Sequence, residues 1–342
     1  MQILTKKEGG LDMSDNIIKL DASVICCGNT VGKKEYEGPL GKYFDFHGTD
    51  DRFSKDTWES AEGEMQRIAL NIALDRGGLS YSDLGAMFAG DLLNQCVGSA
   101  YGLLGCNVPY FGLYGACSTC AEGIMLSSIM TTHGVFSRCA AITSSHNCSA
   151  ERQYRTPIEY GGQRTPTSQW TVTGAGAFVI GDGKAGKVKI TAAMPGRVID
   201  KGINDANNMG AAMVGAVCDT LTRYFRESGT NPNDYDLIIT GDLGHEGAQL
   251  MREFMDIEGY PLGDNYTDCG ILIFDKQKQD THAGGSGCGC SAAVMSAYVI
   301  PAMRKNIIKN TIFIGSGAMM SPDMIKQGNS IPAIGHLVVF ER

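Results

Sequence analysis

One cysteine stands where the sequence places a tight turn at the start of a helix. Cys117 follows Gly115-Ala116 in the string YGACSTCAEGIM, residues 114–125. Glycine suits a tight turn, and the hydroxyl group of Ser118 or Thr119 can cap the helix. We expect the helix N-terminus to lower the pKa of the Cys117 thiol and to favour the thiolate. The position predicts a cysteine that lines a pocket, whereas an ordinary free cysteine is a small buried packing residue.

A nucleophilic cysteine needs a base within hydrogen-bond reach and donors for the oxyanion. Two histidines could act as that base: His146, which follows the apolar run at 139–145, and His282, which precedes a glycine-rich turn. An acyl-transferring enzyme that uses Cys117 is therefore one of the functions that the residues allow.

A second group of side chains could hold an anionic aromatic ligand. The segment 144–164 contains His146, Arg152, Arg155, Arg164, Tyr154 and Tyr160. Guanidinium forks and imidazolium bind carboxylates, and tyrosine rings stack on aromatic rings. We select Cys117, His146, Arg152, Arg155 and Tyr160 as candidate ligand-binding residues. In the alternative interpretation the arginines belong to a solvated loop and His146 is hydrogen-bonded within that loop.

Aspartates head two similar turns, and a serine lies in a third turn. Asp91 and Asn94 follow one apolar run, and Asp242 follows another. Asp242 and Ser286, which lies in the glycine-rich turn at 284–287, complete the candidate ligand-binding set. The aspartates could instead cap loops through side-chain-to-backbone hydrogen bonds. Their oxygen atoms would also suit a calcium ion that arrives with a ligand.

Composition restricts the class of protein. The 342 residues include 45 glycines and 12 cysteines and carry a formal net charge of −8. The acidic balance argues against a nucleic-acid partner. We expect no signal peptide and no membrane-spanning segment, and hence a soluble or membrane-peripheral protein with reduced thiols. The Cys117–Cys120 and Cys288–Cys290 pairs lack a full ligand set, so we predict no metal site.

Short apolar strands alternate with helices, which predicts an α/β fold, and the pattern occurs twice. The repeated strings are FAGDLLN (88–94) with ITGDLGH (239–245), YGACSTCAEGIM (114–125) with GSGCGCSAAVM (285–295), CAAITSS (139–145) with TIFIGSG (311–317), and GAGAFVI (174–180) with AIGHLVVF (333–340). We predict an N-terminal tail at 1–20, a first half at 21–187 and a second half at 188–342. A site between the halves would take residues from both.

A duplicated α/β unit with a cysteine at a strand-to-helix turn resembles the thiolase superfamily. The resemblance implies a five-layered αβαβα sandwich, a homodimer, and the place of the nucleophile for Cys117. Asp242 stands near the position of the family's histidine, and the turn at 284–287 has neither asparagine nor histidine. Ala333 occupies the region of the thiolases' second cysteine. These departures predict a thiolase-like pseudoenzyme that has lost its catalytic partners.

Longer strings narrow the resemblance to the dipicolinic acid-binding sporulation proteins of endospore-forming bacteria. They are AGDLLNQ (89–95), FGLYGACSTC (111–120), TSSHNCSAERQYR (143–155), EYGGQRTPT (159–167), GRVIDKGI (196–203) and HAGGSGCGCSA (282–292). The resemblance implies non-catalytic binding of dipicolinic acid, a pyridine dicarboxylate, for uptake into the developing spore. It implies membrane proteins of the same operon as partners and a place at the forespore or spore inner membrane. It implies no cofactor, with calcium present only together with the ligand.

Overall fold

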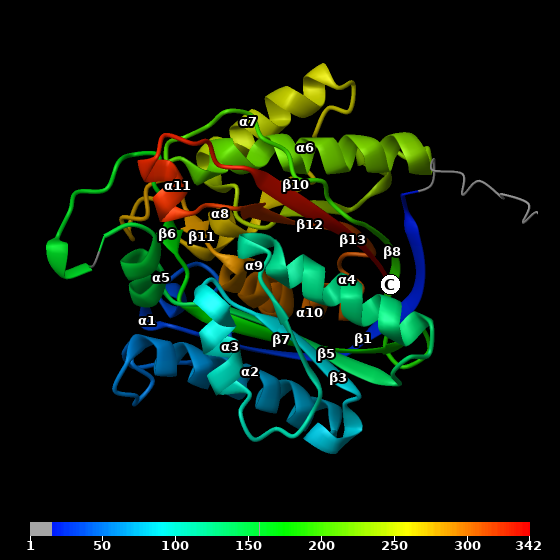
Figure 1. Ribbon diagram of the computed structural model, residues 1–342. Coiled ribbons are helices and arrows are strands. Elements are labelled where there is room, and N and C mark those ends of the chain that lie inside the picture. The colour runs from blue at the N-terminus through cyan, green and yellow to red at the C-terminus, as the bar shows by residue number, and fades with distance from the viewer. Residues whose placement is uncertain (1–15, 157) are drawn as a thin grey trace, which may run out of the picture.

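Two groups of five strands form the framework of the protein, for which the computed structural model describes residues 16–156 and 158–342 (Figure 1). The first group has the order β4-β3-β5-β7-β1. Its strands are β1 (Ile18–Val31), β3 (Ala86–Gly90), β4 (Tyr110–Leu113), β5 (Arg138–Ser145) and β7 (Gly174–Asp182). In β3 the whole run Ala-Met-Phe-Ala-Gly is buried, as expected of a strand covered on both faces.

The second group repeats the topology of the first. Its order is β10-β9-β12-β13-β8, so the strands of each group, numbered along the chain, follow the order 3-2-4-5-1. Its strands are β8 (Val188–Met194), β9 (Leu237–Thr240), β10 (Tyr266–Asp268), β12 (Asn310–Ala318) and β13 (Ala333–Glu341). In both groups the last strand runs antiparallel to its two neighbours. The repeated sequence strings therefore correspond to repeated structure.

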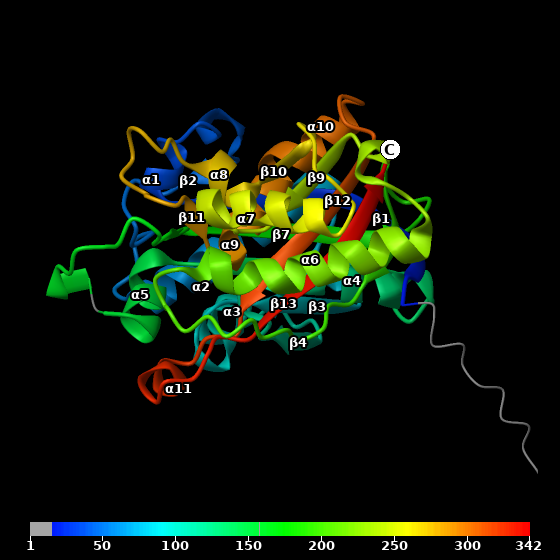
Figure 2. The ribbon, with the colours of Figure 1, turned by 90° about the horizontal axis from the view of Figure 1, so that it is seen from above.

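The two groups join through β1 and β8, which pair antiparallel with Ile18 opposite Ala193 and Val24 opposite Val188. The groups face each other across a central layer of helices, and further helices cover their outer faces (Figures 1 and 2). This arrangement is the five-layered αβαβα sandwich, so the fold predicted from the sequence is confirmed.

The central layer contains α4 (Thr119–Thr132) and α9 (Cys288–Val294), which occupy equivalent places in the two halves. Helix α4 contacts strands of both groups, and α9 packs on β5 and β7 and against α4. Every residue of α9 is buried, because protein surrounds it on all sides. Cys120 and Cys290 belong to the same apolar core, as expected of small packing residues.

Longer helices form the outer layers. On one side lies α2 (Trp58–Gly77) with α3 (Val97–Gly102), and on the other lie α6 (Met209–Ser228) and α7 (Gly244–Ile257). Thr57 caps α2 by accepting a hydrogen bond from the Ser60 amide. Gly78, with φ of 63°, ends α2 in the left-handed conformation that glycine adopts without strain.

Shorter elements surround the two halves. They are α1 (Lys33–Tyr36), β2 (Phe46–His47), α5 (Asn147–Tyr154), β6 (Trp170–Thr171), α8 (Cys269–Ile273), β11 (Gly285–Ser286), α10 (Ile300–Arg304) and α11 (Pro322–Lys326). β6 and β11 pair with each other and so connect the halves a second time. Residues 18–20, which the sequence analysis assigned to the tail, belong to β1, where Leu20 is buried. In the described part of the chain, no helix combines the length and apolar character needed to cross a membrane.

Candidate functional site

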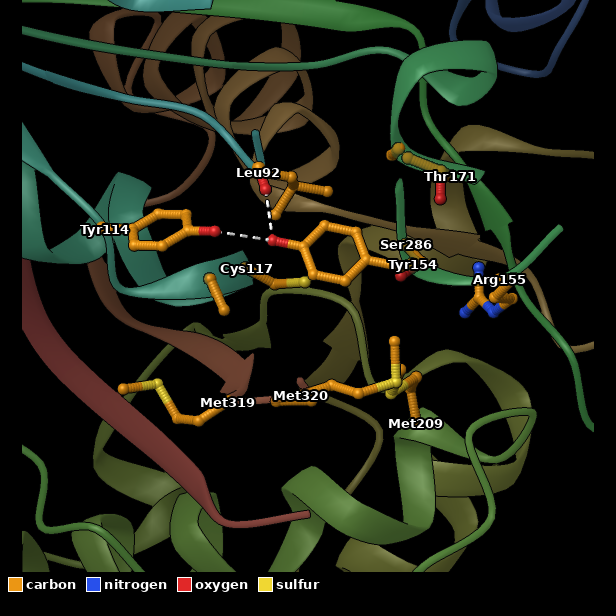
Figure 3. A pocket seen from close by; sticks show the side chains of 13 residues that line it. Leu92, Tyr114, Cys117, Tyr154, Arg155, Thr171, Met209, Ser286, Met319 and Met320 are labelled. Carbon is orange, nitrogen blue, oxygen red and sulfur yellow. Dashed lines mark hydrogen bonds between the residues drawn. The ribbon is translucent and has the colours of Figure 1, made fainter. Parts of the chain in front are cut away.

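A cavity of about 230 Å³ lies where the two halves meet (Figure 3). The first half contributes Leu92, Tyr114, Ala116, Cys117, Ala150, Tyr154, Arg155 and Thr171, and the second contributes Met209, Ser286, Ala318, Met319 and Met320. Three of the predicted ligand-binding residues, Cys117, Arg155 and Ser286, therefore line one cavity. This lining takes residues from both halves, as expected of a site between them.

Cys117 sits in a single helical turn, Ala116–Ser118, which leads into α4. The turn is tight because Ala116 has φ of 51°, a conformation that is uncommon for residues other than glycine. A Cβ at Gly115 would lie 2.4 Å from Glu122 Oε2, so a larger residue there would require the Glu122 side chain to move. Neither predicted cap forms: the hydroxyl groups of Ser118 and Thr119 donate to the carbonyls of Gly115 and Ala116, both at 2.7 Å.

The predicted lowering of the Cys117 pKa is wrong, because the pKa lies well above its ordinary value. Burial is the main cause, since it penalises the charged thiolate. The nearby carboxyl group of Asp242 raises the pKa further through its charge and its interaction with the thiol. The helix N-terminus that follows Cys117 does not offset these two effects, so the thiol is protonated at neutral pH.

Asp242 follows β9 and is fully buried beneath the cavity. Ser316 Oγ donates to Asp242 Oδ1 at 2.7 Å, and Oδ2 accepts from the Gly287 amide at 2.8 Å and from Ser286 Oγ at 3.3 Å. Burial raises the pKa of Asp242, and these hydrogen bonds lower it in part. Asp242 thus orders the turn that carries Ser286 and faces the Cys117 thiol, without lining the cavity itself.

Two tyrosines form one wall of the cavity (Figure 3). Tyr154, near the end of α5, donates its hydroxyl hydrogen to the Leu92 carbonyl. The Tyr114 hydroxyl lies 3.0 Å from that of Tyr154 and donates to Asn94 Oδ1 at 3.0 Å. Asn94 therefore supports the tyrosine pair from outside the cavity. The hydrogen bonds hold both rings in place, with an aromatic face available to a ligand.

Arg155 supplies the guanidinium group of the cavity. It follows α5 and forms an ion pair with Glu151 at 2.5 Å, and its side chain is 17% exposed. Glu151 Oε1 also accepts from the Thr171 hydroxyl at 3.3 Å, so Glu151 connects the arginine to β6. A guanidinium group has further donors beyond this ion pair, and these can bind a carboxylate in the cavity.

Methionines form the opposite wall of the cavity, and none of them was among the predicted ligand-binding residues. Met319 and Met320 follow β12, and Met209 begins α6, facing the tyrosines across the cavity (Figure 3). The sequence repeat did offer a signal for Met319 and Met320, because β12 is the counterpart of β5. His146, a predicted site residue, follows the end of β5, and the two methionines follow the end of β12. Unbranched thioether side chains adapt to a flat apolar ligand.

Besides Asp242 and Asn94, the predicted ligand-binding residues His146, Arg152 and Tyr160 do not line the cavity. His146 is fully buried, with Nε2 2.7 Å from the Asp51 carbonyl oxygen and Nδ1 accepting from the Cys148 amide at 3.2 Å. It caps α5 rather than lining the cavity, and burial lowers its pKa. Arg152 forms an ion pair with Glu59 of α2. Tyr160 is 75% exposed.

Asp91 also has a structural role. Its carboxylate accepts hydrogen bonds from the Leu93 amide at 2.8 Å and from the Ser99 amide and hydroxyl at 2.7 and 2.6 Å. It is fully buried under α3 and does not line the cavity. These contacts agree with the capping interpretation of Asp91 and place its carboxylate outside the cavity.

No histidine lines this cavity within residues 16–156 and 158–342. His245 lies in the first turn of α7. His282 Nδ1 contacts the Thr165 carbonyl oxygen at 2.6 Å, and its Nε2 is 3.0 Å from Asp280. In the same described part of the chain, no cluster of three histidine, cysteine or acidic side chains could hold a metal ion.

Residues 15–341 match the profile of the stage V sporulation protein AD family. Stage V sporulation protein AD of Bacillus subtilis is 41% identical over 319 residues, which cover 93% of this chain and 94% of the relative. That similarity extends over both halves and the cavity between them.

Solved structures with the same fold include 3-oxoacyl-[acyl-carrier-protein] synthases III. The 3-oxoacyl-[acyl-carrier-protein] synthase III of Aquifex aeolicus has a TM-score of 0.56 at 14% identity, over 94% of this chain and 100% of that one. The synthase III of Xanthomonas oryzae has a TM-score of 0.61 at 11% identity, over 95% and 99%. At these identities the likeness concerns the fold alone. The sequence match decides the family, and the chain belongs to the stage V sporulation protein AD family, with a thiolase-like fold.

Proposed function

We propose that this protein binds dipicolinic acid in the cavity beside Cys117, without acyl-transfer chemistry, and thereby serves the uptake of that acid into the developing spore. The supporting observation is the composition of the cavity: one guanidinium group, two tyrosine rings and three methionines surround a protonated thiol. At about 230 Å³ the cavity is smaller than the about 300–1,000 Å³ typical of pockets for larger ligands, which suits a single aromatic ring.

Each part of the ligand finds a chemical partner in this cavity. Arg155 binds one carboxylate through its guanidinium donors. The pyridine ring lies between the Tyr154 side and the methionines, where apolar contact replaces water. The second carboxylate is directed toward the Ser286 hydroxyl group, or is neutralised by a calcium ion that arrives with the ligand. The protein itself needs no cofactor for this role.

The same geometry supports the proposed absence of catalysis. A cysteine nucleophile reacts as the thiolate, and burial together with the Asp242 carboxyl group disfavours that form of Cys117. His146 and His282, the two candidate bases, are both engaged outside the cavity. A pocket that once held a thioester would then retain its shape while binding a small acid.

Calorimetric titration with dipicolinate, with and without calcium, tests the proposal. Arg155→Gln is expected to weaken binding at least tenfold, because charge-assisted hydrogen bonds contribute about 1.5–3 kcal/mol. Arg152→Gln removes the same charge from a residue paired outside the cavity and should bind like the wild type. Isophthalate, which lacks the ring nitrogen, serves as the ligand control. Absence of saturable dipicolinate binding under both conditions would refute the proposal.

The alternative function is acyl transfer through Cys117, favoured by its place at the start of α4 in a fold shared with 3-oxoacyl synthases. Intact-protein mass spectrometry after exposure to acyl-CoA decides between the two functions. An acyl adduct that is absent from Cys117→Ser would establish the enzyme. An unmodified chain, together with dipicolinate binding, is the result expected here.

The proposal includes partners. The resemblance to dipicolinic acid-binding sporulation proteins suggests membrane proteins of the same operon and a peripheral place at the forespore or spore inner membrane. A second copy of the chain is proposed to cover β4, which pairs with β3 alone in the described structure and exposes Tyr110 and Phe111. No nucleic acid is among the proposed partners, given the net charge of −8.

A further inference from the structure

A second cavity, of about 310 Å³, lies on the outer helical layer of the second half. It is formed by α6, the end of α7 and the segment that precedes α6, and these two helices lie side by side in Figures 1 and 2. None of its lining residues belongs to the cavity beside Cys117. Along α6, Met209 in the first cavity and Arg226 in the second are roughly 25 Å apart at 1.5 Å per residue.

The charge of this cavity is opposite to that of the whole chain. Its lining includes four cationic side chains, Arg197, Lys201, Arg223 and Arg226, and two carboxylates, Asp219 and Glu258. The lining therefore carries a net charge of +2, in a protein whose net charge is −8. A local excess of guanidinium groups in a concave site attracts anions despite the overall charge.

One of the cations is held in place by the fold, and the stem of a second lies against α6. Arg223 is only 8% exposed, and its Nε donates to Asp219 Oδ2 at 2.9 Å while Nη2 donates to the Pro195 carbonyl at 3.3 Å. The stem of Lys201 lies directly over Gly215 of α6, where a Cβ would come within 2.6 Å of Lys201 Cγ. Glycine in the middle of a helix disfavours the helix, so its presence here makes room for the lysine.

We propose that this cavity binds a phosphomonoester group. A phosphomonoester carries close to two negative charges on one group at neutral pH, which matches the net charge of +2, whereas a monocarboxylate would leave one positive charge unbalanced. Guanidinium groups bind phosphate oxygens in pairs. Ile257, 80% exposed, and Phe254 add apolar contact for the rest of the ligand. The group could belong to a soluble metabolite or to the headgroup of phosphatidic acid.

The experiment has two arms, which distinguish these sources. The full chain is titrated with inorganic phosphate and glycerol 3-phosphate, and it is sedimented with vesicles of phosphatidylcholine with and without phosphatidic acid. Arg226→Gln removes one cation, and Gly215→Ala keeps every charge but displaces Lys201. Lys305 is an exposed cation directly after α10, and Lys305→Gln is the control with the same charge change.

We expect binding in at least one arm, weakened tenfold or more by both Arg226→Gln and Gly215→Ala and unchanged by Lys305→Gln. Circular dichroism checks that Gly215→Ala keeps its helices. Binding in the titration assigns the soluble source, and binding to phosphatidic acid vesicles alone assigns the lipid. Absence of binding in both arms, or equal binding by Arg226→Gln and Lys305→Gln, would overturn the proposal. Dipicolinate binding at the other cavity is independent of either result.

Discussion

The Cys117 thiol faces the carboxyl group of Asp242, and the two residues come from opposite halves of the chain. The pairing explains why a cysteine at the start of a helix has a raised rather than a lowered pKa. A carboxylate next to a thiol stabilises the proton on sulfur, and burial strengthens the effect. An imidazolium in the same place would do the opposite.

The pairing predicts that Asp242→Asn makes Cys117 more reactive. Removing the charge lowers the thiol pKa, and each unit of decrease gives about tenfold more thiolate at neutral pH. Asparagine can still accept the hydrogen bond from the Gly287 amide, so the turn is retained. Alkylation by iodoacetamide, followed at Cys117 by peptide mass spectrometry, measures the effect. Asp219→Asn, on α6, is the control, and equal rates in the two variants would contradict the prediction.

Tyr154→Phe tests the tyrosine wall of the cavity. The substitution keeps the ring but removes the hydrogen bond to the Leu92 carbonyl, which then accepts only from Gln153 Nε2 at 3.2 Å. We expect a loss of about 1 kcal/mol in the free energy of unfolding and weaker dipicolinate binding. Urea denaturation and calorimetry measure these changes. Tyr160→Phe, at an exposed position, should alter neither, and similar losses in both variants would argue against the assigned role.

Glu62→Gln should stabilise the protein at alkaline pH. Glu62 is fully buried on α2, and its pKa is raised first by burial and then by the charge of Asp91. Ser144 and Ser149 donate to its two oxygens, each at 3.0 Å. The folded state keeps this proton where the unfolded state has lost it, so stability falls as pH rises above the ordinary glutamate pKa. The melting-temperature gain of Glu62→Gln should grow from pH 5 to pH 8; a constant difference would contradict this.

His336 gives the opposite dependence on pH. Burial lowers its pKa from 6.5 to about 4, and its Nδ1 accepts from the Gly196 amide at 3.2 Å. As pH falls, the unfolded chain takes up the proton on His336 before the folded chain does. The stability that the neutral imidazole gives the folded state is therefore complete above pH 6.5 and is lost as pH falls toward 4. Between pH 7 and pH 5 the loss is about 2 kcal/mol. His336→Gln should show a smaller loss in urea denaturation at pH 5, while His133→Gln, at an exposed site, should match the wild type.

The exposed edge strand predicts the oligomeric state. If a second copy covers β4, Phe111→Asp places a charge in the apolar contact and yields a monomer. Val135→Asp introduces the same charge at another exposed apolar position and should leave the dimer intact. Light scattering after size-exclusion chromatography measures both. A monomeric wild-type chain would rule out the dimer.

The sequence predicted the fold because its signals are local and repeated. The stop of α2 at Gly78, the apolar run of β3 and the paired strings of the two halves are each written in consecutive residues. Cys117, Arg155 and Ser286 were found in the same way, from turns that end strands or begin helices. Turn residues of this kind mark where strands and helices end, and the cavity is lined by residues at those ends.

The remaining site residues depend on contacts that local sequence does not encode. Arg152 and Arg155 are one helical turn apart, but Arg152 meets Glu59, 93 positions earlier, whereas Arg155 turns into the cavity. His146 is directed to the Asp51 carbonyl, 95 positions away. Met319 and Met320 reach the cavity only because β12 of the second half faces the first. Tertiary packing decides these orientations, and no spacing rule predicts them.

The antiparallel ladder between β1 and β8 also limits how the protein can come apart. Cutting the chain near residue 187 would leave β1 and β8 as open edge strands, and it would strip one face from the central helix α4. Neither half would keep a complete apolar core, since the largest core cluster draws residues from both. The halves are duplicated in topology but share one core, and we expect them to unfold together in a single calorimetric transition.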